Sequence, residues 1–162
     1  MILLRVRRIV DRWLEAALIL IMGANVLNVL WQVFTRFVLR SPSSFTEELA
    51  RFLLIWVGLL GASYVSGRKM HLAITVVLER WKGRNRMWAE LAIQVNVFVF
   101  ACLVMVVGGT RLAAMTFALK QISAALRIPL GYVYLVIPLS GLLIMFYALF
   151  AAWETIRQAR EA

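Results

Sequence analysis

The sequence predicts an all-α integral membrane protein with four transmembrane helices, an amphipathic interfacial helix between helices two and three, and both termini in the cytoplasm. Of the 162 residues, 63% are hydrophobic and only 16% are charged. A soluble domain of this length has too little interior for so many apolar side chains. Four stretches reach the length of about 20 apolar residues that a bilayer crossing requires. The whole chain, residues 1–162, is therefore expected to form a single membrane domain.

The four predicted spans cover residues 14–38, 47–66, 87–109 and 130–153. Basic residues precede the first span, as in a signal peptide, but the apolar segment is too long and contains Asn25 and Asn28. We therefore expect an uncleaved first helix. The third helix is expected to continue beyond Gly109, because apolar residues recur there at helical spacing. Pro138 predicts a bend in the fourth helix, since proline removes one backbone hydrogen bond.

Basic residues predict the orientation of the chain. Twelve of the 18 Lys and Arg residues lie before the first span, between the second and third, or after the fourth. The positive-inside rule then places both termini in the cytoplasm. The net charge of +10 is divided into short clusters between apolar runs. This arrangement indicates membrane lipids as a partner, and no nucleic acid.

The connection between the second and third spans has an amphipathic pattern. Met70, Ile74, Val77, Leu78 and Trp81 recur at helical spacing, and polar residues occupy much of the remaining circumference. This pattern is typical of a helix that lies in the membrane interface, although a cytosolic loop is the alternative. The residues expected to contact lipid or the cytoplasmic interface are Arg68, Lys69, His71, Trp81, Arg84 and Arg86.

The start of the second span, FTEELARFLLIW, combines charged and apolar residues. Ser44 and Glu47 have the spacing of a capping box, with Ser44 preceding the helix. Arg51 is four residues after Glu47 and three after Glu48, so it can pair with either on one helix face. Local structure thus accounts for much of this motif.

The same motif also has features of a contact with a partner helix. The clearly apolar part, residues 52–65, is too short to cross about 30 Å of hydrocarbon, so Glu47 to Arg51 must reach the outer interface. Ionisable groups at that depth usually face protein or water. Gly58 and Ala62 follow at the four-residue spacing of small residues that allows close helix approach.

Residues that would support catalysis or cofactor binding are absent from the sequence pattern. His71 is the only histidine, which excludes a haem held by two histidines but leaves a His/Met site formally open. No carboxylate lies at the middle of an apolar run, which argues against a small proton-coupled exporter. We predict no enzyme activity, no cofactor and no metal site. Polar residues within the spans are expected to hydrogen-bond between helices: Asn25, Asn28, Gln32, Gln94 and Asn96.

The chain resembles the small membrane subunit, or Q subunit, of tripartite ATP-independent periplasmic (TRAP) transporters along nearly its whole length. The resemblance rests on short motifs in order: Thr35-Arg36-Phe37, Glu47-Glu48-Leu49-Ala50-Arg51, Trp56, Gly61-Ala62, Arg68, His71, Gln121-Ile122-Ser123, Ile128-Pro129, Tyr132 and Ile137-Pro138. No single motif is decisive, but their order on four spans is specific.

The resemblance implies a non-catalytic subunit in the bacterial inner membrane. Its partners would be a large membrane transport subunit and a periplasmic solute-binding protein, for sodium-driven uptake of a carboxylate-bearing solute. The small subunit would stabilise the scaffold of the large one. Candidate residues for the partner interface are Arg36, Glu47, Glu48, Arg51, Trp56, Gly58, Gly61 and Ala62. The sequence leaves two alternatives, a membrane anchor of an electron-transfer complex and a small homodimeric exporter.

Overall fold

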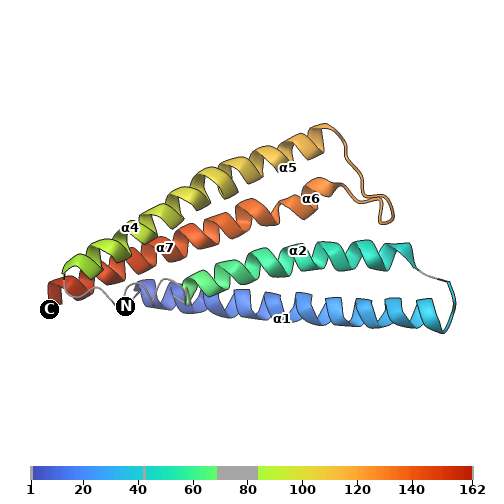
Figure 1. Ribbon diagram of the computed structural model, residues 1–162, viewed down its shortest axis with the longest axis horizontal. Helices are drawn as coiled ribbons and strands as arrows, with labels where there is room; N and C mark the ends of the chain where they lie inside the picture. Colours follow the sequence, from blue (N-terminus) through green and yellow to red (C-terminus); the bar gives the residue numbers. More distant parts are fainter. Residues whose placement is uncertain (1, 42, 69–83, 162) are drawn as a thin grey trace. The chain divides into compact units, whose positions relative to one another are not determined.

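A computed structural model describes residues 2–41, 43–68 and 84–161, which form helices joined by short connections (Figure 1). The helices are α1 (Ile2–Phe37), α2 (Ser44–Gly67), α4 (Arg84–Phe100), the π-helix η1 (Ala101–Gly108), α5 (Gly109–Ala118), α6 (Leu130–Tyr134) and α7 (Val136–Glu161). Four helical stretches are long and apolar enough to cross a membrane: Arg5–Phe37, Ser44–Gly67, Arg86–Ala118 and Leu130–Arg157.

The predicted all-α fold with four spans is confirmed, and the third span continues past Gly109 as predicted. The predicted interfacial helix, with His71 and Trp81, lies outside the described residues, as does the neighbouring Lys69. The cytoplasmic placement of both termini and the single membrane domain stay predictions.

The described chain contains two compact units. One comprises Met1–Gly61 with Arg111–Val136, and the other comprises Ala62–Thr110 with Ile137–Ala162. Each unit is described by itself below.

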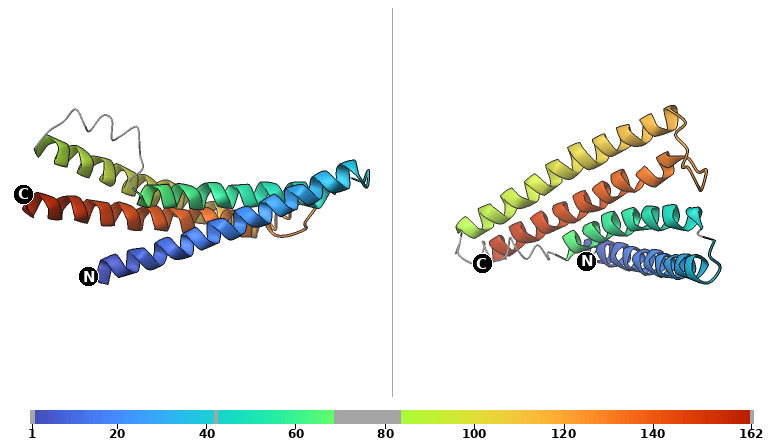
Figure 2. Two further views of the ribbon diagram at one scale, coloured as in Figure 1. Left: turned by 90° about the horizontal axis from the view of Figure 1, so that it is seen from below. Right: turned by 45° about the vertical axis from the view of Figure 1, so that its right-hand side comes forward.

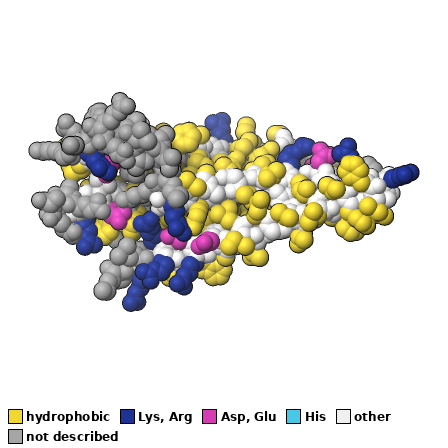
Figure 3. All heavy atoms as spheres, turned by 60° about the horizontal axis from the view of Figure 1, so that its bottom comes forward, with side chains coloured by type: hydrophobic (Ala, Val, Ile, Leu, Met, Phe, Trp, Pro, Cys, Tyr) yellow, Lys and Arg dark blue, Asp and Glu magenta, His cyan; other side chains and the backbone are white. Residues whose placement is uncertain are grey.

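In the first unit, α1 and α2 lie side by side (Figures 1 and 2). Buried and half-buried residues of α1 recur in alternating steps of four and three: Arg7, Asp11, Leu14, Leu18, Ile21, Asn25, Asn28, Gln32 and Thr35. This spacing is typical of two helices that pack at a small crossing angle. From Ala16 to Phe34 the remaining surface of α1 is apolar and largely exposed, including Ile19 and Leu20, as lipid-facing surfaces are. Figure 3 shows how extensively hydrophobic side chains cover the face that it draws.

In the second unit, α4 and η1 run alongside α7 (Figures 1 and 2). A Cβ built on Gly141 would lie 2.7 Å from the Met105 Cβ atom, so these two helices approach closely at a glycine. The Ser63 hydroxyl donates a 3.1 Å hydrogen bond to the Ser140 carbonyl, and both residues are fully buried. Small residues and interhelical hydrogen bonds therefore hold this unit together.

The fourth span is interrupted near Pro138. Helix α6 ends at Tyr134 and α7 begins at Val136, so Leu135 separates them. Pro138 is the third residue of α7, where a backbone N–H has no partner within the helix. The structure thus has a one-residue break just before the proline, and the bend predicted from Pro138 stays a prediction.

Candidate functional site

The carboxylate of Glu48 binds the loop that connects α5 to α6. Its Oε2 atom accepts hydrogen bonds from the Ser123 hydroxyl at 2.9 Å, the Ala125 N–H at 2.8 Å and the Leu126 N–H at 2.9 Å. Its Oε1 atom accepts a bond from the Ala124 N–H at 3.2 Å. We call Glu48 with these four donors the Glu48 anchor.

The α5–α6 loop, residues 119–129, has a backbone that presents these donors together. Lys120 has a positive φ of 48° and ends α5 in a Schellman motif, with the Gln121 N–H bonded to the Thr116 carbonyl at 3.1 Å. Beyond it, the Ser123 N–H bonds to the Ile128 carbonyl at 2.9 Å and closes a tight turn. Successive N–H groups on one side of such a turn form a concave site for an anion, and Glu48 fills it.

Sequence reasoning did not find the Glu48 anchor. It offered Arg51 as a partner for either carboxylate, and the structure pairs Arg51 with Glu47 instead. The Arg51 Nη2 atom is 3.5 Å from the Glu47 Oε1 atom, and the two side chains are 69% and 67% exposed. The predicted capping box differs as well, because α2 already includes Ser44 as its first residue. Ser43 precedes the helix, and its buried hydroxyl has no hydrogen-bond partner among the described residues.

The exposed residues of α2 lie on one face of the helix. After Phe45 they are Glu47, Arg51, Leu54, Gly58, Ala62 and Val65, in steps of three and four. We call this set the exposed α2 face. A Cβ built on Gly58 would have no atom within 4 Å, so the middle of this face is open. The structure thus brings together four of the predicted interface residues on one helix surface.

The other predicted interface residues lie elsewhere. Trp56 and Gly61 are half-buried on α2, outside the exposed α2 face. Arg36 is exposed near the end of α1, with its guanidinium 5.9 Å from the centre of the Phe37 ring. The carboxylate of Glu48 is hydrogen-bonded to the α5–α6 loop.

The residues predicted for the cytoplasmic interface have contacts within the chain wherever their side chains are described. Arg68 donates a hydrogen bond to the Tyr64 hydroxyl, and its guanidinium lies 4.9 Å from the centre of that ring. Arg86 forms a 3.0 Å ion pair with Glu90. The side chain of Arg84 lies outside the described residues.

Three asparagines within the spans differ in their hydrogen bonding. Asn28 donates a 2.7 Å hydrogen bond from its Nδ2 atom to the Thr46 carbonyl, which confirms the predicted bonding between helices at this position. Asn25 is buried, but its Oδ1 atom has no hydrogen-bond partner within the part of the chain that the structure describes. Asn96 instead donates to the Ala92 carbonyl of its own helix at 2.8 Å.

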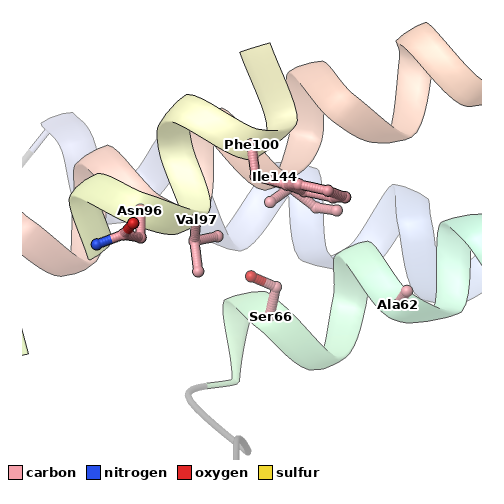
Figure 4. Close-up of a pocket in the computed structure, with 6 residues that line it drawn as sticks. All are labelled: Ala62, Ser66, Asn96, Val97, Phe100 and Ile144. Carbon is pink, nitrogen blue, oxygen red and sulfur yellow. The ribbon is translucent and has the colours of Figure 1, made fainter. Parts of the chain in front are cut away.

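The second unit has an open groove with a cavity volume of about 430 Å³ (Figure 4). Its lining consists of uncharged residues: Ala62, Ser66, Asn96, Val97, Phe100 and Ile144. Figure 4 shows the Ser66 hydroxyl directed toward the Val97 side chain across the groove. Among the described residues, no three His, Cys, Asp or Glu side chains lie close enough together to hold a metal ion.

Most of the chain matches a known protein family. Residues 25–158 match the family described as Tripartite ATP-independent periplasmic transporters, DctQ component. The chain is 29% identical over 102 residues to the sialic acid TRAP transporter small permease protein SiaQ of Vibrio cholerae. The matched region covers 63% of this chain and 59% of that protein. It is 24% identical over 135 residues to a Haemophilus influenzae protein named as a TRAP transporter small permease protein. That matched region covers 83% of this chain and 82% of the relative.

A third similarity is to a larger protein. A 68-residue segment is 32% identical to part of the sialic acid TRAP transporter permease protein SiaT of Haemophilus influenzae, over 42% of this chain and 11% of that protein. These proteins are transporter components and not enzymes, and the family together with the four apolar helices indicates a multi-pass protein of the bacterial inner membrane. The chain belongs to the DctQ component family of tripartite ATP-independent periplasmic transporters and is a subunit of such a transporter.

Proposed function

We propose that this chain is the scaffold subunit of its transporter. It stabilises a large sodium-coupled membrane subunit that takes up a carboxylate-bearing solute delivered by a periplasmic binding protein. The observation that carries the proposal is the exposed α2 face, which combines a charged pair with small residues on a membrane-spanning helix.

The charged pair favours a protein or water contact over a lipid contact. Glu47 and Arg51 are about two-thirds exposed within a helix that qualifies as a membrane span. Charged side chains in a span are unfavourable against lipid and usually face protein or a water-filled space. A partner helix that covers this face, or borders it near the membrane surface, would provide such an environment.

Gly58 and Ala62 make close approach of that partner helix possible. Neither carries a side chain beyond Cβ, and both are exposed. Helices associate in membranes mainly through packing and hydrogen bonds, and small residues four apart allow their backbones to come near. The proposed occupant of the exposed α2 face is therefore a transmembrane helix of the large subunit.

Similarity to SiaT supports this partner. A segment similar to part of this chain occupies 11% of a protein named as a TRAP transporter permease. A small and a large transport component joined in one protein would necessarily be neighbours in the membrane.

The groove in the second unit supports a role outside the solute path. None of the described residues that line it is charged. A carboxylate transferred from water needs a cation or several hydrogen-bond donors to offset its desolvation. The names of SiaQ and SiaT give sialic acid, which carries a carboxylate, as the solute of those relatives. We extend only this chemical class to the present transporter.

Other residues have supporting roles in the proposal. Arg36, Trp56 and Gly61 would contribute to the partner interface outside the exposed α2 face. The Glu48 anchor would fix the α5–α6 loop beside the start of α2, on the side from which the binding protein approaches if both termini are cytoplasmic. Arg68 and Arg86 would lie near the opposite membrane surface.

Replacing Gly58 with leucine should disrupt assembly with the large subunit. The new side chain would fill the space that the partner helix occupies, and overpacking of this kind costs about 1–3 kcal/mol. We expect co-purification of the tagged large subunit to fall about tenfold, and Arg51→Ala to give a smaller loss. Gly23→Leu is the matched control, because Gly23 is also an exposed glycine with no atom within 4 Å of its Cβ position. Equal recovery with Gly58→Leu and Gly23→Leu would show that the exposed α2 face is not the docking surface.

A further inference from the structure

Three arginines near the start of α1 form a basic cluster. Arg5, Arg8 and Arg12 are exposed and, with Ile9, line an open depression of about 260 Å³. Their spacing places them on one side of the helix. Within the described part of the chain none of the three has an acidic partner, whereas Arg7, on the half-buried side, lies 3.8 Å from Asp11. The cluster therefore presents three guanidinium groups that form no ion pair with any described residue.

The position of the cluster increases its positive potential. Helix α1 begins at Ile2 and has no acidic residue in its first turn. The N-terminal end of a helix already carries a partial positive charge from aligned peptide dipoles. This charge acts mainly within the first turn, so it reinforces Arg5, and the other two guanidinium groups contribute their own charge. Guanidinium groups also match phosphate oxygens in geometry, through paired N–H donors.

Beyond the arginines, the same side of α1 carries one exposed carboxylate, Glu15, and then becomes apolar. Ala16 and Ile19 are exposed there, Ile19 by 66%. Trp13, 75% exposed, lies beside them, and tryptophan is enriched at the boundary between headgroups and acyl chains. The surface thus offers cations at one end and an apolar track along the next two turns. This combination matches an amphiphilic ligand and not a soluble anion.

We propose that Arg5, Arg8 and Arg12 bind the phosphate of an anionic phospholipid, with an acyl chain along Ala16 and Ile19. The site takes a lipid from the bilayer in which the chain lies, and it does not depend on the proposed scaffold function. Bound lipid would hold the start of α1 at a fixed depth in the membrane. No other subunit is needed to form the site, so the purified chain suffices for its test.

Native mass spectrometry of the purified full chain in mild detergent can measure lipid binding directly. The probes are phosphatidylglycerol and phosphatidylcholine with identical acyl chains, which differ in net charge. Each basic residue near an anionic lipid contributes about a factor of five in affinity. We expect Arg5→Gln/Arg8→Gln/Arg12→Gln to weaken phosphatidylglycerol binding by about two orders of magnitude and Arg8→Gln alone by about fivefold. Phosphatidylcholine binding should change little in either variant.

The matched control removes three exposed arginines elsewhere. Arg40→Gln/Arg111→Gln/Arg127→Gln has the same net charge as the first triple variant and should keep its phosphatidylglycerol affinity within about twofold. Wild-type affinity in both the first triple variant and Arg8→Gln would overturn the site, as would an equal loss in the control. A third arm adds inorganic phosphate at millimolar concentration. Displacement of phosphatidylglycerol by phosphate would mean that the cluster binds the free anion, and would overturn the assignment to a lipid.

Discussion

Glu48→Ala is expected to release the α5–α6 loop. The substitution removes the acceptor of the Ser123 hydroxyl and of three successive backbone N–H groups. Donors that lose their acceptor inside a folded structure must find water or rearrange, and bonds to a charged acceptor are the stronger kind. We expect trypsin to cut after Lys120 and Arg127 about tenfold faster or more, because cleavage follows the population of the opened loop. Limited proteolysis of the purified chain measures this rate.

Glu47→Ala is the matched control for this experiment. Glu47 is the adjacent carboxylate, but its described contact is one exposed ion pair with Arg51 at 3.5 Å. An exposed pair of this kind contributes about 0–1 kcal/mol, so loop cleavage should stay near the wild-type rate. Unchanged cleavage in Glu48→Ala, or the same increase in both variants, would show that the Glu48 anchor does not hold the loop.

Gly141→Ala is expected to destabilise the packing of η1 against α7. The added methyl group would lie 2.7 Å from the Met105 Cβ atom and 3.2 Å from the Val106 backbone nitrogen. Neither atom is the end of a flexible side chain, so the helices themselves must move apart. Overpacking of this kind costs about 1–3 kcal/mol. Unfolding of the purified chain by a denaturing detergent, followed by circular dichroism, measures the loss.

Gly108→Ala provides the comparison within η1. The nearest atom to its Cβ position is the Leu103 carbonyl oxygen at 3.7 Å, which is ordinary contact distance. Alanine has a higher helix propensity than glycine, so this variant should be as stable as the wild type or up to about 1 kcal/mol more stable. A Gly141→Ala protein as stable as Gly108→Ala would mean that η1 and α7 do not pack as closely as described.

The four spans could be predicted because membrane crossing imposes a length and a composition that are visible in the sequence. The Asn28 bond to α2 was predictable for a related reason, since a polar side chain inside a span needs a partner. Helix ends were less accurate. The first span begins at Arg5 and not at residue 14, and α2 includes Ser44 as its first residue. These ends depend on backbone geometry as well as on residue type.

The Glu48 anchor could not be predicted from sequence pattern. Its donors lie 75 to 78 residues further along the chain, and they are mainly backbone groups that every residue but proline possesses. Helical spacing predicted Arg51 as a partner for Glu48, so the sequence pattern offered no reason to expect a second, distant partner for that carboxylate. The π-helix η1 was missed for a similar reason. Its hydrogen-bond pattern is not encoded by a recognisable residue type, and it packs closely against Gly141 of a distant helix.

Stabilisation of the large subunit tests the scaffold role most directly and does not require knowledge of the solute. The large subunit would be purified alone, with the wild-type chain, and with the Gly58→Leu variant, and its melting temperature would be compared. A partner that binds only the folded state raises the apparent stability of that state. We predict a higher melting temperature with the wild-type chain and a value close to that of the large subunit alone with Gly58→Leu. A large subunit that melts at the same temperature with and without the wild-type chain would contradict the scaffold function.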